Sequence, residues 1–389
     1  MTIVAPYCYS WSRSNSVYQI KTLMDARNKA KVSYVTLAFA IADARGNITS
    51  DIYNCYDDIK QFQTSGGKVI LSFGGAAGPY LTSVMSADQE YNVMYKLLQD
   101  TGIRMIDYDV EGAYIAMQSQ NDQRSKVLAR LQQAIPGLYV SFTLAVEAPS
   151  QWSKGGLPAN AIDMLKNAIA NGVNVNVVNM MTMDYYTSLP AGKSWGQIAC
   201  DISESVKTQL QSLYPSKSEI DLYKMIGITP MIVRNDDNTV FALSDAKIVA
   251  TYAQQKGIGL LAFWAIQRDQ VGTGELAVYS QVNKNNFEFT NVFLSVQSQQ
   301  PQPQPSLLQP QPSIVQPQPK PQPTPSSKSK PTPSHPQPTP IFSAWQENVS
   351  YKIGDIVSYN GSNYKCIQAH TSIVTWAPGI YTQALWKLN

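Results

Sequence analysis

The sequence predicts an α/β protein: a (β/α)8 barrel of the TIM type, a linker rich in Pro and Gln, and a small all-β module. Three observations predict it. β-Branched apolar runs alternate with amphipathic segments up to about residue 290, a proline-rich stretch follows, and short alternating runs fill the last 49 residues. We therefore expect a barrel domain at 1–293, a disordered linker at 294–340 and a β module at 341–389.

Eight apolar runs are expected to form the strands of the barrel. They are nearly continuous in apolar residues, which is typical of parallel strands buried on both faces. Eight such strand–helix units fit a closed barrel. The alternative, an open doubly wound sheet, is disfavoured because no glycine-rich phosphate loop follows the first run. The runs span residues 3–9, 32–42, 68–75, 104–111, 138–146, 175–184, 223–231 and 258–265.

Composition marks the boundary between the barrel and the last module. Residues 301–340 contain 15 of the 24 prolines and no Asp, Glu, Phe, Tyr or Trp. Such a segment cannot bury a core, and it predicts an extended spacer with a reach of at most about 3.1 Å per residue. A ligand for SH3 or WW domains is the alternative, but alternating Pro and Gln is a generic spacer composition.

The overall composition argues against several functional classes. The net charge of +3 is weak and the Lys and Arg residues are scattered, so no nucleic-acid partner is expected. No run reaches the ~18 apolar residues of a membrane span, so no membrane partner is expected. The four cysteines form no CxxC pair, and neither a zinc site nor a disulfide framework is indicated. We expect no cofactor, and we expect a monomer.

Both histidines, His335 and His370, lie beyond the first 300 residues. The predicted barrel therefore contains no histidine. This excludes Ser-His-Asp or Cys-His catalysis there, and any metal site with a histidine ligand. Chemistry in the barrel has to use carboxylate, Tyr, Ser or Lys side chains.

The fourth run carries three acids in a short space. In "MIDYDVEG" (105–112), Asp107, Asp109 and Glu111 are separated by single apolar residues. Side chains alternate between the faces of a strand, so the acids should face the barrel interior. Neighbouring buried carboxyls cannot all ionise cheaply, and at least one pKa should rise, as a general acid near neutral pH requires. Glu111 lies nearest the C-terminal rim, where barrel active sites lie.

Two other interpretations of these acids exist. A solvated acidic edge is disfavoured, because such an edge would not be interleaved with Ile, Tyr and Val in a parallel sheet. A magnesium site is the second alternative. The pattern favours general acid–base catalysis on a glycosidic bond. We expect no metal ion at this site.

The same residues carry a family resemblance. "IDYDVE" (106–111) resembles the DxxDxDxE signature of glycoside hydrolase family 18, the chitinase family. "LSFGG" (71–75), with Ser72, Gly74 and Gly75, is similar to the SxGG motif of that family. "NMMTMDYY" (179–186) resembles its sixth-strand motif, and "GLLAFWA" (259–265) resembles its eighth-strand motif with Trp264. The resemblance covers residues 1 to about 290, and the four motifs fall at the expected strand ends.

Two departures from the family pattern are visible. Arg104 stands where the signature has its first Asp, so the inner charge network should differ, although that acid is not the catalytic one. The sixth-strand motif is usually MxYD; here it reads MTMD (181–184), and Tyr185 and Tyr186 follow. Either tyrosine could contact the substrate, and we favour Tyr185.

The resemblance implies a substrate-assisted retaining hydrolysis, in which the N-acetyl carbonyl of the sugar attacks the anomeric carbon. Glu111 would protonate the leaving oxygen and then activate water. Asp109 would hydrogen-bond the acetamido N–H and stabilise the oxazolinium-like intermediate, and Asp107 would share a proton with Asp109. Asp184 and Tyr185 would orient the acetamido group.

Further residues are expected to form the substrate site. Trp264 would stack on the sugar as the floor of the −1 subsite, with core packing as the alternative. Met181 and Ser72 are placed at the site by the same motifs, and Gly74 and Gly75 would let the backbone approach closely. Only about 26 residues separate the seventh and eighth runs, which leaves no room for the inserted α+β subdomain of some family members. A shallow cleft and internal cleavage are therefore expected.

The last 49 residues resemble the small chitin-binding modules of carbohydrate-binding families 5 and 12. Flat aromatic faces suit the apolar face of a sugar ring. Trp376 is the best candidate for an exposed contact and Tyr364 a weaker one, whereas core packing is expected for Trp345 and Trp386. The linker would tether the barrel to the polymer.

The expected function is thus that of an endo-acting chitinase whose partner is chitin or another N-acetylglucosamine polymer. A catalytically weak chitin-binding lectin, an N-acetylglucosaminidase acting on glycoprotein or peptidoglycan, and an adhesive protein that displays the module are the alternatives. The start "MTIVAPYCYSW" lacks the pattern of a Sec signal peptide. Since the substrate is extracellular, release by lysis, signal-independent export, or a viral or intracellular setting is expected.

Overall fold

The structure is a computed structural model that describes residues 1–298 except 15, 44, 78 and 151–153. It also describes residues 343–388 except 347–348, 360–361, 373–377 and 379–385. The chain divides into two compact units, Met1–Leu307 and Leu308–Asn389. Most of the predicted linker lies outside the described residues. Among the described helices, none combines the length and apolar character that a membrane span requires.

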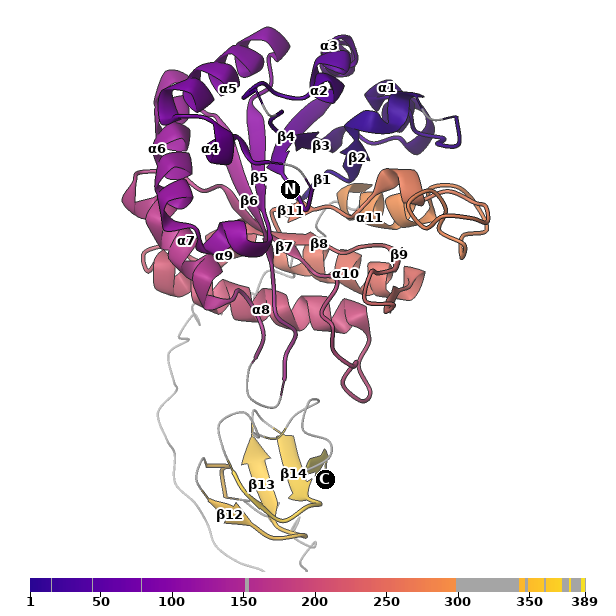
Figure 1. Cartoon of the computed structure of the whole chain (residues 1–389). Helices are drawn as coiled ribbons and strands as arrows, with labels where there is room; N and C mark the ends of the chain where they lie inside the picture. Colours follow the sequence, from indigo (N-terminus) through magenta and orange to yellow (C-terminus); the bar gives the residue numbers. More distant parts are fainter. Residues whose placement is uncertain are drawn as a thin grey trace, which may run out of the picture. The chain divides into compact units, whose positions relative to one another are not determined.

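Nine strands of the first unit form one parallel sheet (Figure 1). They are β1 (Ile3–Val4), β2 (Tyr7–Tyr9), β3 (Tyr34–Ala40), β4 (Lys68–Gly74), β5 (Met105–Val110), β6 (Tyr139–Ala145), β7 (Val177–Met181), β8 (Ile226–Thr229) and β11 (Leu260–Leu261). Their order is β1-β11-β8-β7-β6-β5-β4-β3-β2.

The first predicted run closes this sheet into a barrel. It is divided into β1 and β2, which are separated by Ala5 and Pro6. β1 pairs with β11 at one end of the strand order, and β2 pairs with β3 at the other. The two pieces therefore occupy one barrel position, and the predicted (β/α)8 barrel is confirmed.

Helices alternate with the strands and surround the sheet (Figure 1). Capping residues mark several of their ends: Ser86 and Gln89 form a capping box at the start of α5, and Gly102 ends that helix in a left-handed conformation. The helices are α1 (Leu23–Ala30), α2 (Ser50–Asn54), α3 (Tyr56–Thr64), α4 (Leu81–Val84), α5 (Ala87–Thr101), α6 (Gln118–Ala134), α7 (Ala159–Ala170), α8 (Trp195–Leu213), α9 (Glu219–Lys224), α10 (Leu243–Lys256) and α11 (Glu288–Ser298). The helix α11 runs past residue 293, where the barrel domain was predicted to end.

The alternation of side chains separates the core into layers. The outward-facing residues of β5, Ile106, Tyr108 and Val110, pack in the main core with residues of the helices. Inside the barrel, residues near the starts of the strands, such as Ile70 and Val177, form a separate apolar cluster. The acids of β5 lie further along the strand, above this apolar layer.

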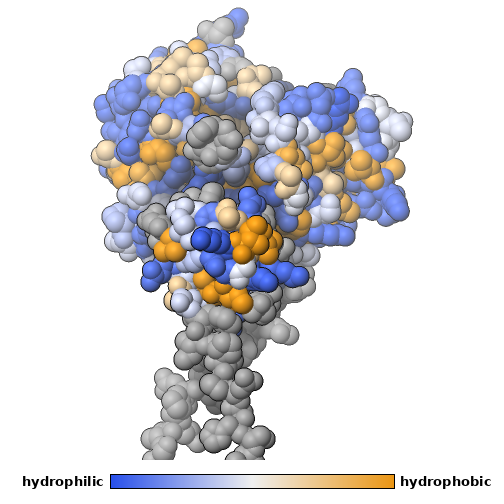
Figure 2. All heavy atoms as spheres, turned by 90° about the horizontal axis from the view of Figure 1, so that it is seen from below, coloured by the Kyte–Doolittle hydropathy of each residue, from blue (hydrophilic) through white to orange (hydrophobic). Residues whose placement is uncertain are grey.

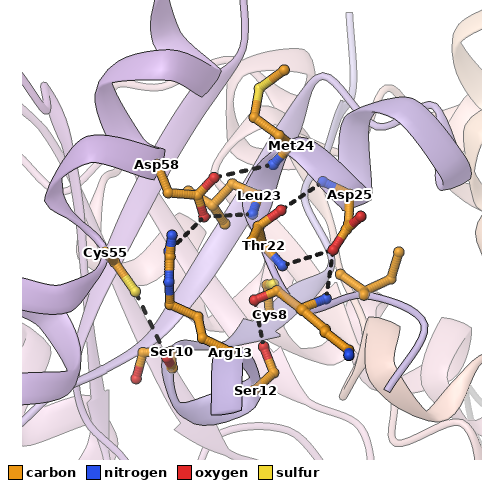
Figure 3. A network of polar contacts seen from close by, with 12 residues as sticks. Cys8, Ser10, Ser12, Arg13, Thr22, Leu23, Met24, Asp25, Cys55 and Asp58 are labelled. Atoms are coloured by element: carbon orange, nitrogen blue, oxygen red, sulfur yellow. Dashed lines mark hydrogen bonds and ion pairs between the residues drawn. The ribbon is translucent and has the colours of Figure 1, made fainter. Parts of the chain in front are cut away.

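The segment that follows β2 at the barrel rim is tied to two helices (Figure 3). It forms a 3-10 turn, η1 (Ser10–Ser14). Asp58 of α3 accepts the backbone N–H groups of Leu23 (2.7 Å) and Met24 (3.3 Å) in the first turn of α1, and it lies 3.8 Å from the Arg13 guanidinium. A buried carboxylate thus satisfies helix N–H groups that have no partner within the helix.

The stretch between β8 and β11 is short. Within residues 230–259, all of which are described, the structure forms the hairpin β9 (Val233–Arg234) and β10 (Val240–Phe241), followed by α10. This segment contains no inserted α+β subdomain.

The described part of the second unit is all-β, as predicted. Its strands are β12 (Ser350–Tyr351), β13 (Ile356–Tyr359), β14 (Ser362–Cys366), β15 (His370–Thr371) and β16 (Trp386–Leu388). They form a pair, β12-β15, and a three-stranded sheet, β13-β14-β16. Tyr351, Val357, Cys366 and Trp386 form a small core, and the partly buried Trp345 packs against it.

Candidate active site

Asp107 lies inside the barrel within a shell of hydroxyl groups. Its Oδ1 accepts hydrogen bonds from Ser141 Oγ (2.6 Å) and Thr143 Oγ1 (2.9 Å), and its Oδ2 accepts them from Ser72 Oγ (2.8 Å) and the Tyr7 hydroxyl (3.4 Å). Burial raises the pKa of Asp107 to about 6, although these donors act in the opposite direction. The carboxyl can therefore gain or lose a proton near neutral pH.

Asp109 is the next inward-facing acid on β5, and it is 4% exposed. Its Oδ1 is buried and has no hydrogen-bond partner among the described residues. Burial raises the pKa of Asp109 well above its usual range, and the charges of Glu111 and Asp107 raise it further. A buried oxygen of this kind can accept a hydrogen bond from a ligand N–H group.

Glu111 follows the last residue of β5 and is partly buried. Burial raises the pKa of its carboxyl, and the negative charge of Asp184 raises it further. A carboxyl that stays protonated towards neutral pH can donate a proton to a leaving group. The column of acids predicted from β5 thus runs from the barrel interior to the rim.

Asp184 lies in the loop after β7, three residues beyond the strand end at Met181. The hairpin loop between β9 and β10 holds it in place. Its Oδ1 accepts the backbone N–H groups of Asp236 (2.7 Å) and Asp237 (3.2 Å), and its own N–H donates to Asn235 Oδ1 (3.4 Å). Burial raises the pKa of Asp184, the two N–H donors lower it, and the charge of Asp236 raises it.

The two tyrosines after Asp184 point in different directions. The ring of Tyr185 stacks on Trp195 of α8, with ring centroids 5.3 Å apart, and its hydroxyl is buried. Tyr186 is 77% exposed. Met181 is partly buried at the end of β7. The structure thus packs Tyr185 into the wall of the barrel, and its contact with substrate stays a prediction.

Trp264 forms part of an aromatic group at the barrel mouth. Its ring is stacked on Phe39 at a centroid distance of 5.7 Å, and it lies 5.6 Å from the ring of Tyr7 and 5.1 Å from that of Tyr9. The side chain is partly exposed. It therefore contributes to packing and also presents a surface on which a sugar could stack.

The two glycines of "SFGG" lie where no side chain fits. A Cβ at Gly74 would lie 2.3 Å from the carbonyl oxygen of Asp109 and 2.6 Å from the ring of Tyr80. A Cβ at Gly75 would lie 2.7 Å from the ring of Phe39. Both residues have positive φ, 101° and 87°. The motif therefore allows the end of β4 to approach β5 closely beside the acids.

The structure adds site residues that sequence reasoning missed. Thr143 accepts a hydrogen bond from Asn179 Nδ2 (2.9 Å), and Asn179 Oδ1 accepts one from Thr229 Oγ1 (2.8 Å), so the polar layer extends across three strands. Polar residues spaced by two in the run "YVSFTLA" (139–145) are the signal that could have revealed Ser141 and Thr143. Tyr80 lies in a loop, where no periodic pattern identifies it.

The acids in the described part of the site are not grouped as the ligands of a metal ion. Among the described residues, no group of three or more His, Cys, Asp or Glu side chains is placed to hold a metal ion. The oxygens of Asp107 accept hydrogen bonds from hydroxyl groups.

Two residues of the second unit were predicted to contact the polymer, and the structure describes one of them. Tyr364 lies on β14, is partly buried and packs against the small core. Trp376 lies outside the described residues. Large apolar side chains exposed on this unit include Ile353 and Ile367. Figure 2 shows hydrophobic residues interspersed with hydrophilic ones on the visible surface.

Comparison with known families agrees with this geometry. The sequence profile described as "Glycosyl hydrolases family 18" matches residues 3–224, more than half of the chain. The chain belongs to glycoside hydrolase family 18. Residues 344–387 match the profile of carbohydrate-binding module family 5/12, so this family 18 chain carries a module of that class at its C-terminal side.

Solved structures include similar family 18 enzymes. A chitinase active domain from Pyrococcus furiosus is 30% identical, with a TM-score of 0.66, over 76% of this chain and 95% of that one. One of its structures contains chito-oligosaccharides. A family 18 chitinase from Chromobacterium violaceum, 16% identical with a TM-score of 0.50, covers 77% of this chain and 84% of that one and shares the fold.

Curated relatives of this family 18 chain are longer than it is. Endochitinase 11 of Metarhizium anisopliae is 29% identical over 65% of this chain, which spans 51% of that protein. A probable bifunctional chitinase/lysozyme of Escherichia coli is 29% identical over 67% of this chain, which spans 31% of that protein. The C-terminal module is 51% identical over 50 residues (13% of this chain, 7% of that protein) to part of chitinase A1 of Niallia circulans.

Proposed function

We propose that this family 18 chain is a chitinase that hydrolyses β-1,4 bonds between N-acetylglucosamine units. One observation carries the proposal: Asp107, Asp109 and Glu111 form a column of buried or partly buried carboxyls, each with a raised pKa, that leads to the rim of the barrel. The similarity to a chitinase domain solved with chito-oligosaccharides supports chitin as the substrate class.

In the proposed mechanism Glu111 is the general acid and then the general base. Its proton passes to the glycosidic oxygen while the acetamido carbonyl oxygen of the sugar bonds to the anomeric carbon and the bond between that carbon and the glycosidic oxygen breaks. The ionised Glu111 then takes a proton from water, which adds to the anomeric carbon and opens the oxazolinium ring. The raised pKa of Glu111 favours the protonated form that the first step requires.

Asp109 and Asp107 would stabilise the charge that develops on the acetamido group. The unpartnered Oδ1 of Asp109 is available to accept the acetamido N–H. Asp107 lies deeper on β5 and would share a proton with Asp109. Because these are neighbouring carboxyls, one shared proton lowers their mutual repulsion.

The remaining residues of the site would position the sugar. Asp184, held by the hairpin loop, would orient the acetamido group, and Trp264 would form the floor of the −1 subsite. Met181, Ser72, Gly74 and Gly75 would shape the site from β7 and β4. A direct contact of Tyr185 with the acetamido group remains part of this proposal.

Hydrolysis with wild-type protein and Glu111→Gln tests the proposal. We expect wild type to release soluble oligomers from colloidal chitin, and the variant to lose about two to four orders of magnitude in rate, as is typical when a general acid is removed. Glu275→Gln, at an exposed position, is the matched control and should keep its rate within about twofold. Binding of chitin by wild type without release of oligomers would indicate a lectin and contradict the proposal.

Internal cleavage is the finer part of the proposal. The short stretch of residues 230–259 supports an open cleft, because it contributes a hairpin and α10 without a subdomain to cover the substrate. An endo-acting enzyme lowers the viscosity of a soluble chitin derivative early, before many reducing ends form. Release of one product length with unchanged viscosity would contradict internal cleavage.

A second candidate substrate is peptidoglycan. The name of the Escherichia coli relative includes lysozyme activity, and peptidoglycan also contains N-acetylglucosamine. Release of soluble fragments from peptidoglycan faster than from colloidal chitin would favour this candidate. The family 5/12 module favours chitin.

A further inference from the structure

The hydroxyl of Tyr80 lies where β5 ends and Glu111 begins. Tyr80 is 1% exposed and directly precedes α4. Its hydroxyl donates to the carbonyl oxygen of Asp109 (2.8 Å), lies 3.1 Å from the carbonyl oxygen of Gly75, and accepts the backbone N–H of Glu111 (2.9 Å). The N–H of Gly75 also donates to the carbonyl of Asp109 (3.0 Å). One phenol oxygen therefore joins the two peptide groups on either side of Val110.

This bond replaces a strand partner. The pairing of β5 with β6 ends at Val110 and Leu144, so Glu111 lies beyond the ladder. An N–H group left unpaired in a buried place is destabilising. The Tyr80 hydroxyl satisfies this N–H and fixes the direction in which the chain leaves the strand.

The ring of Tyr80 is itself held firmly. The ring of Tyr114 lies 4.2 Å away between centroids. On the side of β4, a Cβ at Gly74 would lie 2.6 Å from the Tyr80 ring, so the absence of a side chain there makes room for the phenol. The glycine, the phenol and the end of β5 thus form one packed unit.

We propose that Tyr80 is a positioning residue for Glu111. Its hydroxyl fixes the backbone position of Glu111 and thereby the direction in which the carboxyl points. The inference rests on the proposed role of Glu111. Burial, together with the neighbouring charges of Asp109 and Glu111, raises the pKa of Tyr80, so the phenol stays protonated and continues to donate.

The test is Tyr80→Phe, which keeps the ring and removes the hydroxyl. On a soluble chito-oligosaccharide we expect kcat to fall about 10- to 100-fold, because a small misplacement of a catalytic group has effects of this size. KM should stay within about threefold, because the sugar contacts are unchanged. Amide hydrogen exchange of Glu111 should become at least about tenfold faster, because its N–H loses its acceptor.

Tyr108→Phe is the matched control. It removes another buried hydroxyl of the same region, which donates to Glu90 (2.8 Å) on the helix side of β5. We expect it to lower the melting temperature at least as much as Tyr80→Phe, but to keep kcat within about threefold and leave the Glu111 exchange rate unchanged. Equal losses of kcat in both variants would show a general effect of stability and overturn the proposal.

Three further outcomes bear on the proposal. If Tyr80→Phe fails to fold, the hydroxyl serves the whole barrel rather than Glu111, and the proposal is wrong. If wild type shows no turnover on any amino-sugar polymer, the proposed function fails, whereas the exchange rate of the Glu111 amide still tests the bond to Tyr80. Unchanged exchange in Tyr80→Phe would refute the positioning role whatever the activity.

Discussion

At the scale of single residues, the site depends on carboxyls that are buried to different depths. Asp107 is surrounded by hydroxyl donors, whereas Asp109 has a buried oxygen without a partner among the described residues. Burial is the largest cause of the raised pKa of both carboxyls. The negative charges of Glu111 and Asp107 raise the pKa of Asp109 further. Glu111 is less buried and responds to the charge of Asp184. Their different environments are consistent with the different roles proposed for these chemically similar groups.

Asp184→Asn tests the charge that acts on Glu111. The negative charge of Asp184 raises the pKa of Glu111. In the proposed mechanism Glu111 is protonated at the start of the reaction, so kcat should fall on the alkaline side of its pH profile as Glu111 ionises. Removal of the charge lowers the pKa of Glu111, so we expect this alkaline limb to move to lower pH. A kcat–pH profile of both proteins measures the shift.

Asp163→Asn is the control for this measurement. Asp163 is an exposed residue of α7 that pairs with Lys166, and its replacement should leave the profile in place. A limb that stays fixed in Asp184→Asn, or that moves to higher pH, would show that Asp184 does not act on the acid through its charge.

At the scale of elements, the ends of neighbouring strands and loops build the site. β4 approaches β5 closely because Gly74 has no side chain, and the β9–β10 loop holds Asp184 through backbone N–H groups. The C-terminal ends of parallel strands meet at one face of a barrel. Groups from distant parts of the chain therefore converge there on rigid supports.

Gly74→Ala should destabilise the barrel more than the replacement of a glycine that has a positive φ but no close neighbour, because the end of β4 lies close to β5 at Gly74. Its Cβ would lie 2.3 Å from a backbone oxygen, in addition to the strain of a φ of 101°. We expect a loss of about 2–5 kcal/mol in the free energy of unfolding, from backbone strain and overpacking together. Calorimetry of the full chain measures it in the barrel's transition, which should be the larger one because unfolding enthalpy scales with size.

Gly257→Ala is the matched control for backbone strain. Gly257 ends α10 with a φ of 72°, and a Cβ there would meet no atom within 4 Å. We expect it to cost about 1 kcal/mol. Similar losses for the two variants would show that the close contact at Gly74 contributes nothing beyond its φ.

At the scale of the whole molecule, the chain forms two compact units with different contents. The barrel contains the carboxyls, and the second unit is a module of carbohydrate-binding family 5/12. A binding module joined to a catalyst raises the local concentration of the catalyst at a polymer surface without new contacts between the two.

Removal of residues 308–389 tests this division. We expect the remaining chain to hydrolyse soluble chito-oligosaccharides at the rate of the full protein, but to bind and degrade insoluble chitin at least about tenfold less well. Pull-down on chitin and release of soluble sugar from the same suspension measure both properties. A matching loss on soluble oligomers would mean that the module also serves the catalytic site.

Much of the fold could be predicted from local patterns. The eight apolar runs correspond to the barrel strands, although Ala5 and Pro6 divide the first of them into β1 and β2. Proline has no N–H to donate, which accounts for an interruption of the strand there. The alternation of β5 also predicted that Asp107 and Asp109 face inward, because side-chain direction in a strand follows from sequence position alone.

Side-chain direction in loops could not be predicted in this way. Tyr185 was favoured over Tyr186 for a substrate contact, and that contact stays a prediction. The sequence did not indicate that the ring of Tyr185 stacks on Trp195 or that its hydroxyl is buried. Asp184 and Tyr186 both have positive φ, 48° and 50°. Backbone of this kind follows no period of two, so the sequence offers no rule for where each side chain points.

The sequence by itself determined the barrel, its order of strands and the column of acids on β5, because strand period and the meeting of strand ends are local rules. Only the tertiary structure decided which partners surround those acids. The hydroxyls of Ser141 and Thr143 around Asp107, the phenol of Tyr80 on the backbone of Glu111, and the hairpin loop that holds Asp184 come from segments between about 30 and 50 positions away. Such contacts depend on how elements pack in space. A local pattern such as the period of two in β6 indicates at most which side chains face inward, and not which groups they contact.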